Sequence, residues 1–288
     1  RGKVLGGSSS INAMVYIRGQ HADYDHWAAQ GNPGWSWKDV KPYFLRAENN
    51  ERGANDWHGR GGPFNVADLR APNRFSQYFT DAGVQAGHPH NTDFNGATQE
   101  GVGLYQVTHK NGERHSAAKG YLTPHLARPN LQVITGAHAT RILFDGTRAV
   151  GVEYRQGGAI KQVRAGREVL LSAGALLSPQ LLMLSGVGPA AHLQHHGIPV
   201  LHDLPGVGQH LPDHPDEVHV LDAPELKDLF GLSLSGMAQT LRGIIEWRKH
   251  RTGMLTTNFA EAGGFIKSDP SEAAPDLQLH FVIGKLVD

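Results

Sequence analysis

The sequence predicts a mixed α/β fold, and three observations lead to it. Residues 131–172 resemble a run of short strands, a helix with clear start and stop signals follows them, and small residues near the start of the chain predict a tight turn. The stretch 49–101 is rich in Gly, Asn, Asp and Pro, which is typical of loops that cover a scaffold. The chain is therefore expected to cross between a strand-rich core and a loop-rich cover, in an α/β or α+β arrangement.

Composition narrows the function classes. Lys plus Arg equals Asp plus Glu at 27 each, which argues against a surface for nucleic acid or an anionic membrane. The absence of cysteine excludes disulfides, zinc thiolates and a cysteine nucleophile, and it fits a cytoplasmic protein. No apolar run reaches the roughly 18–20 residues of a membrane helix. The length of 288 residues allows one large domain or two ordinary ones.

The small-residue turn is the first candidate site. Gly6, Gly7 and Ser8 lie between apolar Val4 and a further apolar stretch that begins at residue 11. Small residues let a backbone approach a bulky anionic ligand, and the amides of a turn that opens into a helix can bind phosphate. An ordinary tight turn is an equally good interpretation of these residues alone. Asn12 would then either bond a ligand edge or cap a helix.

Strand patterns occupy 131–135, 138–145, 149–155, 160–164 and 168–172, with turns at 145–146 and 157–158. The last strand is continuously apolar, as a strand buried on both faces would be. The helix after it has Ser178 as N-cap, Pro179 at its first position and Gly186 as its stop, and a second short helix spans 190–196. Gly174 lies at the carboxyl end of the buried strand, where open α/β sheets hold nucleotides; close helix–strand packing is the alternative.

Outside this region the periodicity predicts three elements. A helix over 37–47 begins with Ser36 and Asp39 as a capping box. A helix with one apolar face spans 235–250, and alternation predicts a strand over 277–283.

Two other clusters carry weaker signals. Histidines 192, 195 and 196 lie on the predicted short helix, and histidines 210, 214 and 219 lie near Asp213 and Asp216. No His-Glu-x-x-His motif occurs, so a metal site is a minor hypothesis. No Gly-x-Ser-x-Gly motif supports a serine hydrolase. Glu261, among apolar neighbours, could anchor a polar substrate, although a structural ion pair is the commoner explanation for such a residue.

Taken together, these blocks resemble the glucose–methanol–choline (GMC) oxidoreductases, flavoenzymes that oxidise alcohols with FAD. The run GKVLGGSSSIN at 2–12 is similar to the first family signature, and GALLSPQLLMLSGVG at 174–188 is similar to the second. The stretches 93–96, 114–122, 131–155 and 206–208 resemble the family in the same order. The resemblance covers nearly the whole chain.

The resemblance implies roles for individual residues. Gly6, Gly7 and Ser8 would lie against the FAD pyrophosphate and flavin, Asn12 to Val15 beneath the isoalloxazine, and Ala139 against the adenine. The implied cofactor-binding set is Val4, Gly6, Gly7, Ser8, Asn12, Ala13, Met14, Val15, Ala139 and Gly174. Some members carry a histidine, covalently bound to the flavin, at position 11; here it is Ile11, so non-covalent FAD is expected. Glu261 would face the cationic head of choline, as in choline-oxidising members.

The departures from the family also carry expectations. By the family pattern, the Gly-x-Gly-x-x-Gly motif would precede residue 1 and the catalytic histidine segment would follow Asp288, so the chain is expected to be an internal fragment that is inactive alone. His210 and Pro212 stand where relatives usually have asparagine and often glutamine, which puts the flavin-side hydrogen bonds of that loop in doubt. The implied domains are 1–20 and 111–215 in the FAD domain, Rossmann-like and partial, and 21–110 and 216–288 in the substrate domain.

The resulting functional prediction is a fragment of an FAD-dependent dehydrogenase that oxidises a primary alcohol, choline-like, aliphatic or aromatic, to the aldehyde. The alternatives are a non-redox lyase of the same fold and a non-catalytic binding module. The expected partners are a small alcohol and an electron acceptor, either oxygen or a quinone, with no nucleic acid. The expected location is cytoplasmic, with membrane association through the acceptor as a variant.

Overall fold

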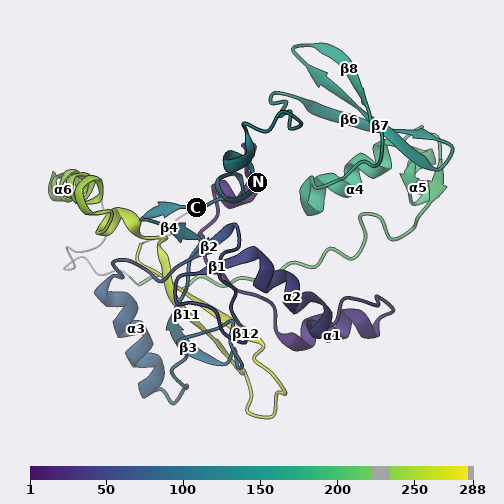
Figure 1. Cartoon of the computed structure of the whole chain (residues 1–288). Coiled ribbons are helices and arrows are strands. Elements are labelled where there is room, and N and C mark those ends of the chain that lie inside the picture. Colours follow the sequence, from purple (N-terminus) through teal and green to yellow (C-terminus); the bar gives the residue numbers. More distant parts are fainter. Residues whose placement is uncertain (222–233, 285–288) are drawn as a thin grey trace. The chain divides into compact units, whose positions relative to one another are not determined.

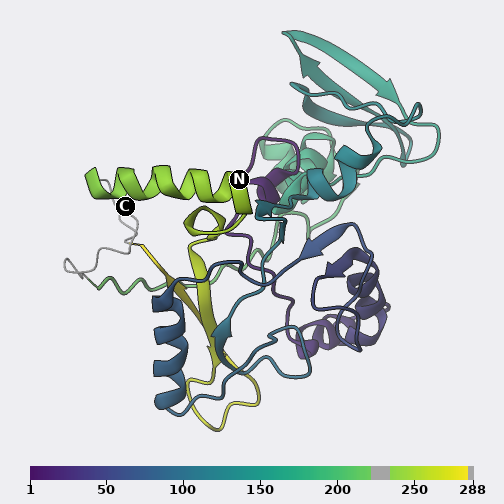
Figure 2. The ribbon, with the colours of Figure 1, turned by 60° about the vertical axis from the view of Figure 1, so that its left-hand side comes forward.

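The computed structural model describes residues 1–221 and 234–284, and the chain divides into two compact units (Figures 1 and 2). Unit 1 comprises Arg1–Leu131 and His219–Asp288, and unit 2 comprises Gln132–Val218. The mixture of helices and strands confirms the predicted α/β class. The assignment of 1–20, 21–110, 111–215 and 216–288 to an FAD and a substrate domain stays a prediction.

Unit 1 is built on a three-stranded antiparallel sheet in the order β12-β11-β3. Its strands are β3 (Gly101–Leu104), β11 (Ala260–Ile266) and β12 (Leu277–Val282), so the strand expected near the end of the chain is confirmed. Phe94, Tyr105 and Phe265 form a buried cluster on this sheet. Gly263 is required beside them, because a Cβ at this position would overlap the Tyr105 hydroxyl.

The expectation of loops throughout 49–101 is wrong. Strands β1 (Glu48–Asn50) and β2 (Phe64–Val66) pair in parallel, and helix α3 (Arg74–Gln85) lies against the sheet (Figures 1 and 2). The buried face of α3 consists of Ser76 and Thr80, and Gly83 approaches Val102 so closely that a Cβ would lie 2.8 Å from its side chain. Phe79 of α3 stacks on Phe281 of β12, so the packed face of the helix combines an aromatic ring with these small and polar residues.

The two predicted helices of unit 1 are confirmed. Helix α2 is Trp37–Ala47 and helix α6 is Leu234–His250. The start of α2 differs in detail from a capping box, because Ser36 Oγ donates to Asp39 Oδ2 at 2.6 Å instead of bonding backbone amides. The remaining elements of unit 1 are η1 (Gly7–Ser10), α1 (His21–Ala29), β4 (His109–Lys110), β5 (Glu113–Arg114), η2 (Ala118–Leu122), η3 (Thr123–His125) and η4 (Met254–Thr256).

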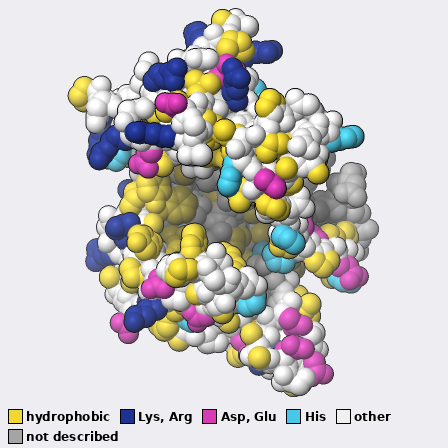
Figure 3. Space-filling view, turned by 90° about the vertical axis from the view of Figure 1, so that its right-hand side faces the viewer, with side chains coloured by type: hydrophobic (Ala, Val, Ile, Leu, Met, Phe, Trp, Pro, Cys, Tyr) yellow, Lys and Arg dark blue, Asp and Glu magenta, His cyan; other side chains and the backbone are white. Residues whose placement is uncertain are grey.

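Unit 2 contains the strongest confirmed prediction. Strands β6 (His138–Asp145), β7 (Arg148–Gln156) and β8 (Ala159–Arg164) form an antiparallel sheet, joined by the expected glycine turns. Lys and Arg side chains gather over the upper part of the face drawn in Figure 3. Helix α4 (Gly174–Leu184), strand β9 (Val187–Gly188), helix α5 (Ala190–His195) and strand β10 (His202–Asp203) complete the unit.

Two predicted strands of this region are wrong. Residues 131–135 and 168–172 are irregular, and Leu170, expected inside a buried strand, is 80% exposed. A strand is stable only with a paired neighbour, and no strand of residues 1–221 or 234–284 pairs with either segment.

Helix α4 also begins earlier than predicted. Its first residue is Gly174, and Pro179 lies inside the helix. Ala173 N donates to Ser178 Oγ at 3.1 Å, so the predicted cap residue serves the amide of an earlier residue. The predicted stop is confirmed, because Gly186 has a left-handed φ of 88° directly after the C-cap. Helix α5 likewise ends before Gly197.

None of the helices formed by residues 1–221 and 234–284 combines the length and the apolarity that a bilayer crossing requires.

The close approach at Gly263 gives a test of the unit 1 core. We expect Gly263→Ala to lower the free energy of unfolding by about 1–3 kcal/mol, because the added methyl group overpacks against Tyr105. Urea unfolding measures this change. Gly166→Ala is the matched control, because nothing lies within 4 Å of a Cβ at Gly166. Equal stability of both variants would contradict the packing described here.

Candidate functional site

The small-residue turn presents one of its glycines to open space. Gly7 N donates to Val4 O at 3.0 Å, and Gly6 and Gly7 have left-handed φ values of 90° and 57°. A Cβ on Gly6 would lie 2.5 Å from Ser10 Oγ, so packing requires glycine there. A Cβ on Gly7 would meet nothing within 4 Å. The turn therefore offers its backbone at Gly7 for close approach by a ligand.

Serine hydroxyls hold the shape of this turn. Ser9 Oγ donates to Gly6 O at 2.6 Å and accepts from Ala117 N at 2.9 Å, while Ser10 Oγ donates to Leu5 O at 2.8 Å. The turn opens into the four-residue η1 and no longer helix. Both hydroxyls are engaged in these hydrogen bonds, so a ligand at the turn would contact its backbone and not the side chains of Ser9 and Ser10.

Asn12 lies beyond η1 and stabilises the turn. Its Oδ1 accepts from Met14 N at 3.2 Å and from Arg114 Nη1 at 2.9 Å, and the same Arg114 nitrogen donates to Ser9 O at 3.1 Å. The predicted alternatives for Asn12 were a ligand bond and a helix cap; its Oδ1 instead fixes the conformation of the turn. Arg114 was not predicted as part of the site, although it lies within one of the family-like stretches.

The segment Ala13 to Val15 is anchored to the core of unit 1. Ala13 O accepts from Asn258 Nδ2 at 2.8 Å, and Met14 O accepts from Thr108 N at 2.8 Å. Val15 forms an antiparallel bridge with Val107. Met14 has a left-handed φ of 62° and is only 7% exposed. The predicted site residues 12–15 thus lie together in a fixed conformation.

A buried ionic network continues this anchoring. Arg18 Nη2 donates to Glu48 Oε2 at 2.7 Å, and His58 lies between two carboxylates, with Nδ1 3.0 Å from Glu48 Oε1 and Nε2 2.9 Å from Asp93 Oδ2. Burial alone would lower the pKa of His58, but its hydrogen bonds to Asp93 and Glu48 raise that pKa to about 9. The imidazole is therefore charged at neutral pH and links two segments of the loop region.

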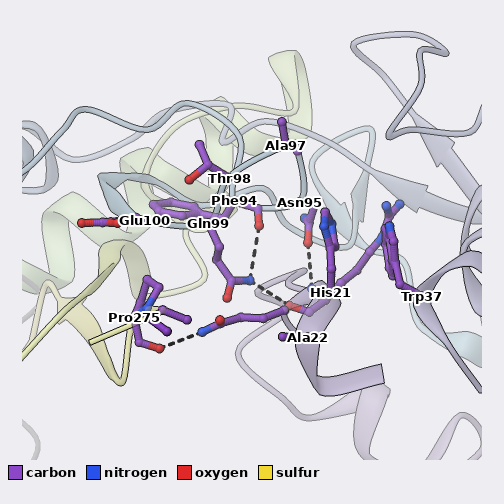
Figure 4. Close-up of a pocket in the computed structure, with 16 residues that line it drawn as sticks. His21, Ala22, Trp37, Phe94, Asn95, Ala97, Thr98, Gln99, Glu100 and Pro275 are labelled. Atoms are coloured by element: carbon purple, nitrogen blue, oxygen red, sulfur yellow. Dashed lines mark hydrogen bonds between the residues drawn. The ribbon is translucent and has the colours of Figure 1, made fainter. Parts of the chain in front are cut away.

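A small cavity of about 260 Å³ lies beside this network (Figure 4). Arg18 N donates to Asn95 Oδ1 at 2.7 Å, and Gln99 Nε2 donates to Arg18 O at 2.9 Å and to Phe94 O at 3.3 Å. Across the cavity Gln20 Nε2 donates to Pro275 O at 2.7 Å. Asn95, Gln99 and Gln20 thus engage backbone groups around the cavity, which fixes the end of the 13–18 segment.

Glu261 lies on β11 at a bulge, where the pairing with β12 shifts register. Its carboxylate is 1% exposed; Oε2 accepts from Asn73 N at 2.6 Å and Ser76 Oγ at 2.8 Å, and Oε1 accepts from Thr257 Oγ1 at 2.6 Å. Asn73 and Ser76 belong to the start of α3, so Glu261 stabilises the N-terminus of that helix. Neutral donors therefore hold Glu261, in place of the ion pair expected as the commoner explanation.

The other predicted residues belong to different parts of the molecule. Val4 is exposed beside the turn in unit 1. Ala139 is exposed on β6 and pairs with Tyr154, and Gly174 opens α4 with a φ of 87° and open space where a Cβ would lie; both belong to unit 2.

The predicted histidine clusters form no metal-binding group among the residues that the structure describes. Among residues 1–221 and 234–284, no group of three or more His, Asp or Glu side chains could hold a metal ion. His192 and His195 contact His196 ring to ring on α5, whereas residues 210–219 are irregular and exposed.

The charged His58 predicts a pH dependence. Because its pKa is raised when the protein is folded, the stabilisation that it contributes is complete below about pH 6.5 and is lost as the pH rises through about 9. We expect the free energy of unfolding to fall across this window by at most about 1.4 kcal/mol per pH unit, and His58→Gln to remove that slope. Denaturant unfolding at a series of pH values measures it. A slope unchanged in His58→Gln, or removed equally by the exposed control His26→Gln, would contradict the network.

The environment of Glu261 predicts a structural effect. Glu261→Gln places an amide N–H where donors already converge, so we expect a loss of about 1–3 kcal/mol of unfolding free energy. Thermal unfolding compares it with Glu272→Gln, an exposed carboxylate on a loop. A carboxylate reserved for a ligand would give equal stabilities for the two variants.

Comparison with known proteins identifies the family. The family model "GMC oxidoreductase" matches residues 1–216. An "Alcohol dehydrogenase [acceptor]" of Pseudomonas putida is 48% identical over 291 residues, covering 100% of this chain and 52% of that protein. An "Oxygen-dependent choline dehydrogenase" of Brucella ovis is 45% identical, covering 98% of this chain and 51% of the relative. The chain thus spans about half the length of these curated relatives.

Solved structures agree with this identification. An FAD-dependent oxidoreductase from Chaetomium thermophilum matches with a TM-score of 0.80 and 31% identity, covering 91% of this chain and 48% of that one. A formate oxidase matches with a TM-score of 0.81 and 25% identity, covering 98% and 54%. The resemblance inferred from the two signatures is confirmed: the chain belongs to the GMC oxidoreductase family.

Proposed function

We propose that this chain forms part of an FAD-dependent oxidoreductase that converts a primary alcohol to the aldehyde. The support is the family and the names of its relatives, which include alcohol and choline dehydrogenases and an FAD-dependent oxidoreductase. The observation that carries the proposal is the turn at Gly6 and Gly7, whose outer glycine leaves its backbone open to a bulky ligand.

The residues present fit FAD. The Gly7 amide is bonded to Val4 O, so Gly7 offers open space on its outer side for close contact with a ring, and exposed apolar side chains of Val4, Leu5 and Ile11 flank the turn. Within unit 2, Gly174 at the start of α4 also has open space where a Cβ would lie. Bound FAD would supply the acceptor for the hydride that leaves the alcohol carbon.

The residues of this chain would hold and orient the FAD cofactor. The anchored segment Ala13 to Val15 would provide a fixed platform for the flavin, and the Ala139 backbone would contact the adenine. Asn258, Thr108 and Arg114 are added to the predicted set, because they fix this segment by hydrogen bonds. Preorganisation of this kind lowers the entropy lost when the cofactor binds.

Three finer points belong to the same proposal. Ile11 offers no nucleophile for a bond to the flavin, so the cofactor is non-covalent. The electron acceptor is oxygen or a quinone-like compound, since one relative is named for an acceptor and another for oxygen. The location is cytoplasmic, with membrane association through the acceptor as the variant to be tested by fractionation.

The turn allows a sharp test of cofactor binding. We expect Gly7→Asn to weaken FAD binding at least about tenfold, equivalent to 1.4 kcal/mol, because asparagine tolerates the left-handed backbone but fills the open space. Gly146→Asn is the matched control, since Gly146 has the same φ of 57° and equally open surroundings on the turn between β6 and β7. Flavin fluorescence titration of the protein encoded by the reading frame that contains this chain measures both.

Equal FAD affinity in the two variants would contradict the placement of the cofactor at Gly7. Absence of bound flavin and of dye-coupled alcohol oxidation in that protein would contradict the proposed function itself.

A further inference from the structure

Helix α6 (Leu234–His250) carries an apolar stripe that residues 1–221 and 234–284 leave exposed. Its members are spaced at i, i+4, i+7 and i+8, so they project from one side of the helix. Their exposed fractions are 62% for Met237, 62% for Leu241, 36% for Ile244 and 56% for Ile245. Single exposed apolar residues are ordinary on a protein surface, whereas a contiguous apolar patch marks a docking surface.

The packed side of α6 is a different one. Gly243 is buried, and a Cβ at this position would lie 2.9 Å from the Met254 side chain. Trp247, one turn further along, donates through Nε1 to Gly112 O at 2.8 Å. Gly243 and Trp247 project about a third of a turn away from the stripe. Figures 1 and 2 show α6 at the periphery of unit 1, so the helix is held by one side while its apolar stripe faces outward.

Basic side chains border the stripe. Arg242 and Lys249 lie on one flank of it, and Arg248 continues it toward the C-terminal end of the helix. All three side chains are exposed. Glu246 is the only acidic residue in the sequence of α6, so the exposed surface of this helix is positively charged. The equal numbers of acidic and basic residues in the whole chain conceal this local excess.

A lipid surface is the partner that this combination fits best. The stripe contains no aromatic ring and has a lysine on its flank, whereas the centres of protein interfaces are enriched in aromatic residues and depleted in lysine. A helix that lies on a bilayer inserts its apolar face at the level of the head groups, and the Lys and Arg side chains beside that face reach the phosphates. The positive flank is therefore complementary in charge to anionic lipids.

We propose that α6 is a docking surface for an anionic lipid bilayer. The helix lies parallel to the membrane plane, with its apolar stripe among the head groups, and does not cross the bilayer. This inference goes beyond the proposed function and does not depend on it, because α6 would bring the protein to a membrane whichever alcohol or electron acceptor the protein uses.

Vesicle flotation of the protein encoded by the reading frame that contains this chain tests the stripe. The vesicles are a two-to-one mixture of phosphatidylcholine and phosphatidylglycerol. We expect the unmodified protein to bind them, and the variant Leu241→Gln with Ile245→Gln to bind at least about tenfold more weakly, because it loses apolar contact with the lipid. Tyr43→Gln with Val84→Gln is the matched control, because these two apolar side chains are exposed on α2 and α3; it should bind as the unmodified protein does.

A second pair of variants tests the basic flank. Arg242→Gln with Lys249→Gln should weaken binding to the mixed vesicles at least about fivefold, because each basic side chain near the surface attracts the anionic lipid. Raised salt should weaken the binding of the unmodified protein in the same direction, since it screens this attraction. Lys38→Gln with Arg46→Gln, two exposed basic residues on α2, is the control and should leave binding unchanged.

Absence of binding to the mixed vesicles, or equal binding of Leu241→Gln with Ile245→Gln and of its control, overturns the proposal. Two measurements without lipid identify another occupant of the stripe, and either one overturns the proposal too. A fall in Tm of this variant as large as that of Gly263→Ala would show that another part of the same protein covers the stripe. Conversion of a dimer to a monomer in sedimentation would show that a second copy covers it. None of these measurements uses flavin or alcohol, so their result stands apart from that of the proposed function.

Discussion

The buried ion pair between Arg18 and Glu48 is the interaction on which the loop-rich part of unit 1 depends. Both side chains are buried, so the loss of their hydration must be offset by good geometry and further hydrogen bonds. Glu48 accepts hydrogen bonds from Arg18, from His58 and from Gly59 N, the last at 2.9 Å. Burial alone would raise the pKa of Glu48, but these bonds hold that pKa below its usual range. Asp93 binds the far side of His58. Segments that form few strand pairs are joined in this way through charged groups.

This network explains how an irregular segment can serve as a binding platform. A ligand bound by backbone groups needs a backbone that does not move, and residues 13–18 gain that rigidity from hydrogen bonds to Asn258, Thr108, Gln106 and Asn95 and from the Arg18 ion pair. The turn at Gly7 stands at one end of this segment and leaves its outer face open. Rigidity at residues 13–18 and access at Gly7 are therefore complementary features of the proposed cofactor site.

The fold was predictable where local pattern and pairing agree. The β6–β8 sheet, α2, α6 and β12 follow from alternation, helical periodicity and glycine turns within their own sequences. Prediction failed where tertiary contacts decide: the packed face of α3 combines Phe79, which stacks on Phe281 of β12, with Ser76 and Thr80. Residues 168–172 have no paired strand among the residues that the structure describes. In the candidate site, the tight turn at Gly6 and Gly7 was predictable from its small residues, and the contacts of residues 12–15 with FAD stay a prediction. Glu48, His58 and Asp93 were not predictable, because polar residues in loops give no sign that they will be buried together.

Amide hydrogen exchange of the protein encoded by this reading frame, with and without FAD, tests the central claim most directly. The account predicts that the amides of Tyr16 and Arg18, bonded to Gln106 O and Asn95 Oδ1, exchange slowly even without FAD. It also predicts that the amides of η1 become protected only when FAD is added. Rapid exchange at Tyr16 and Arg18 without FAD would contradict a preformed platform, and unchanged exchange of η1 at saturating FAD would contradict a cofactor site at the turn.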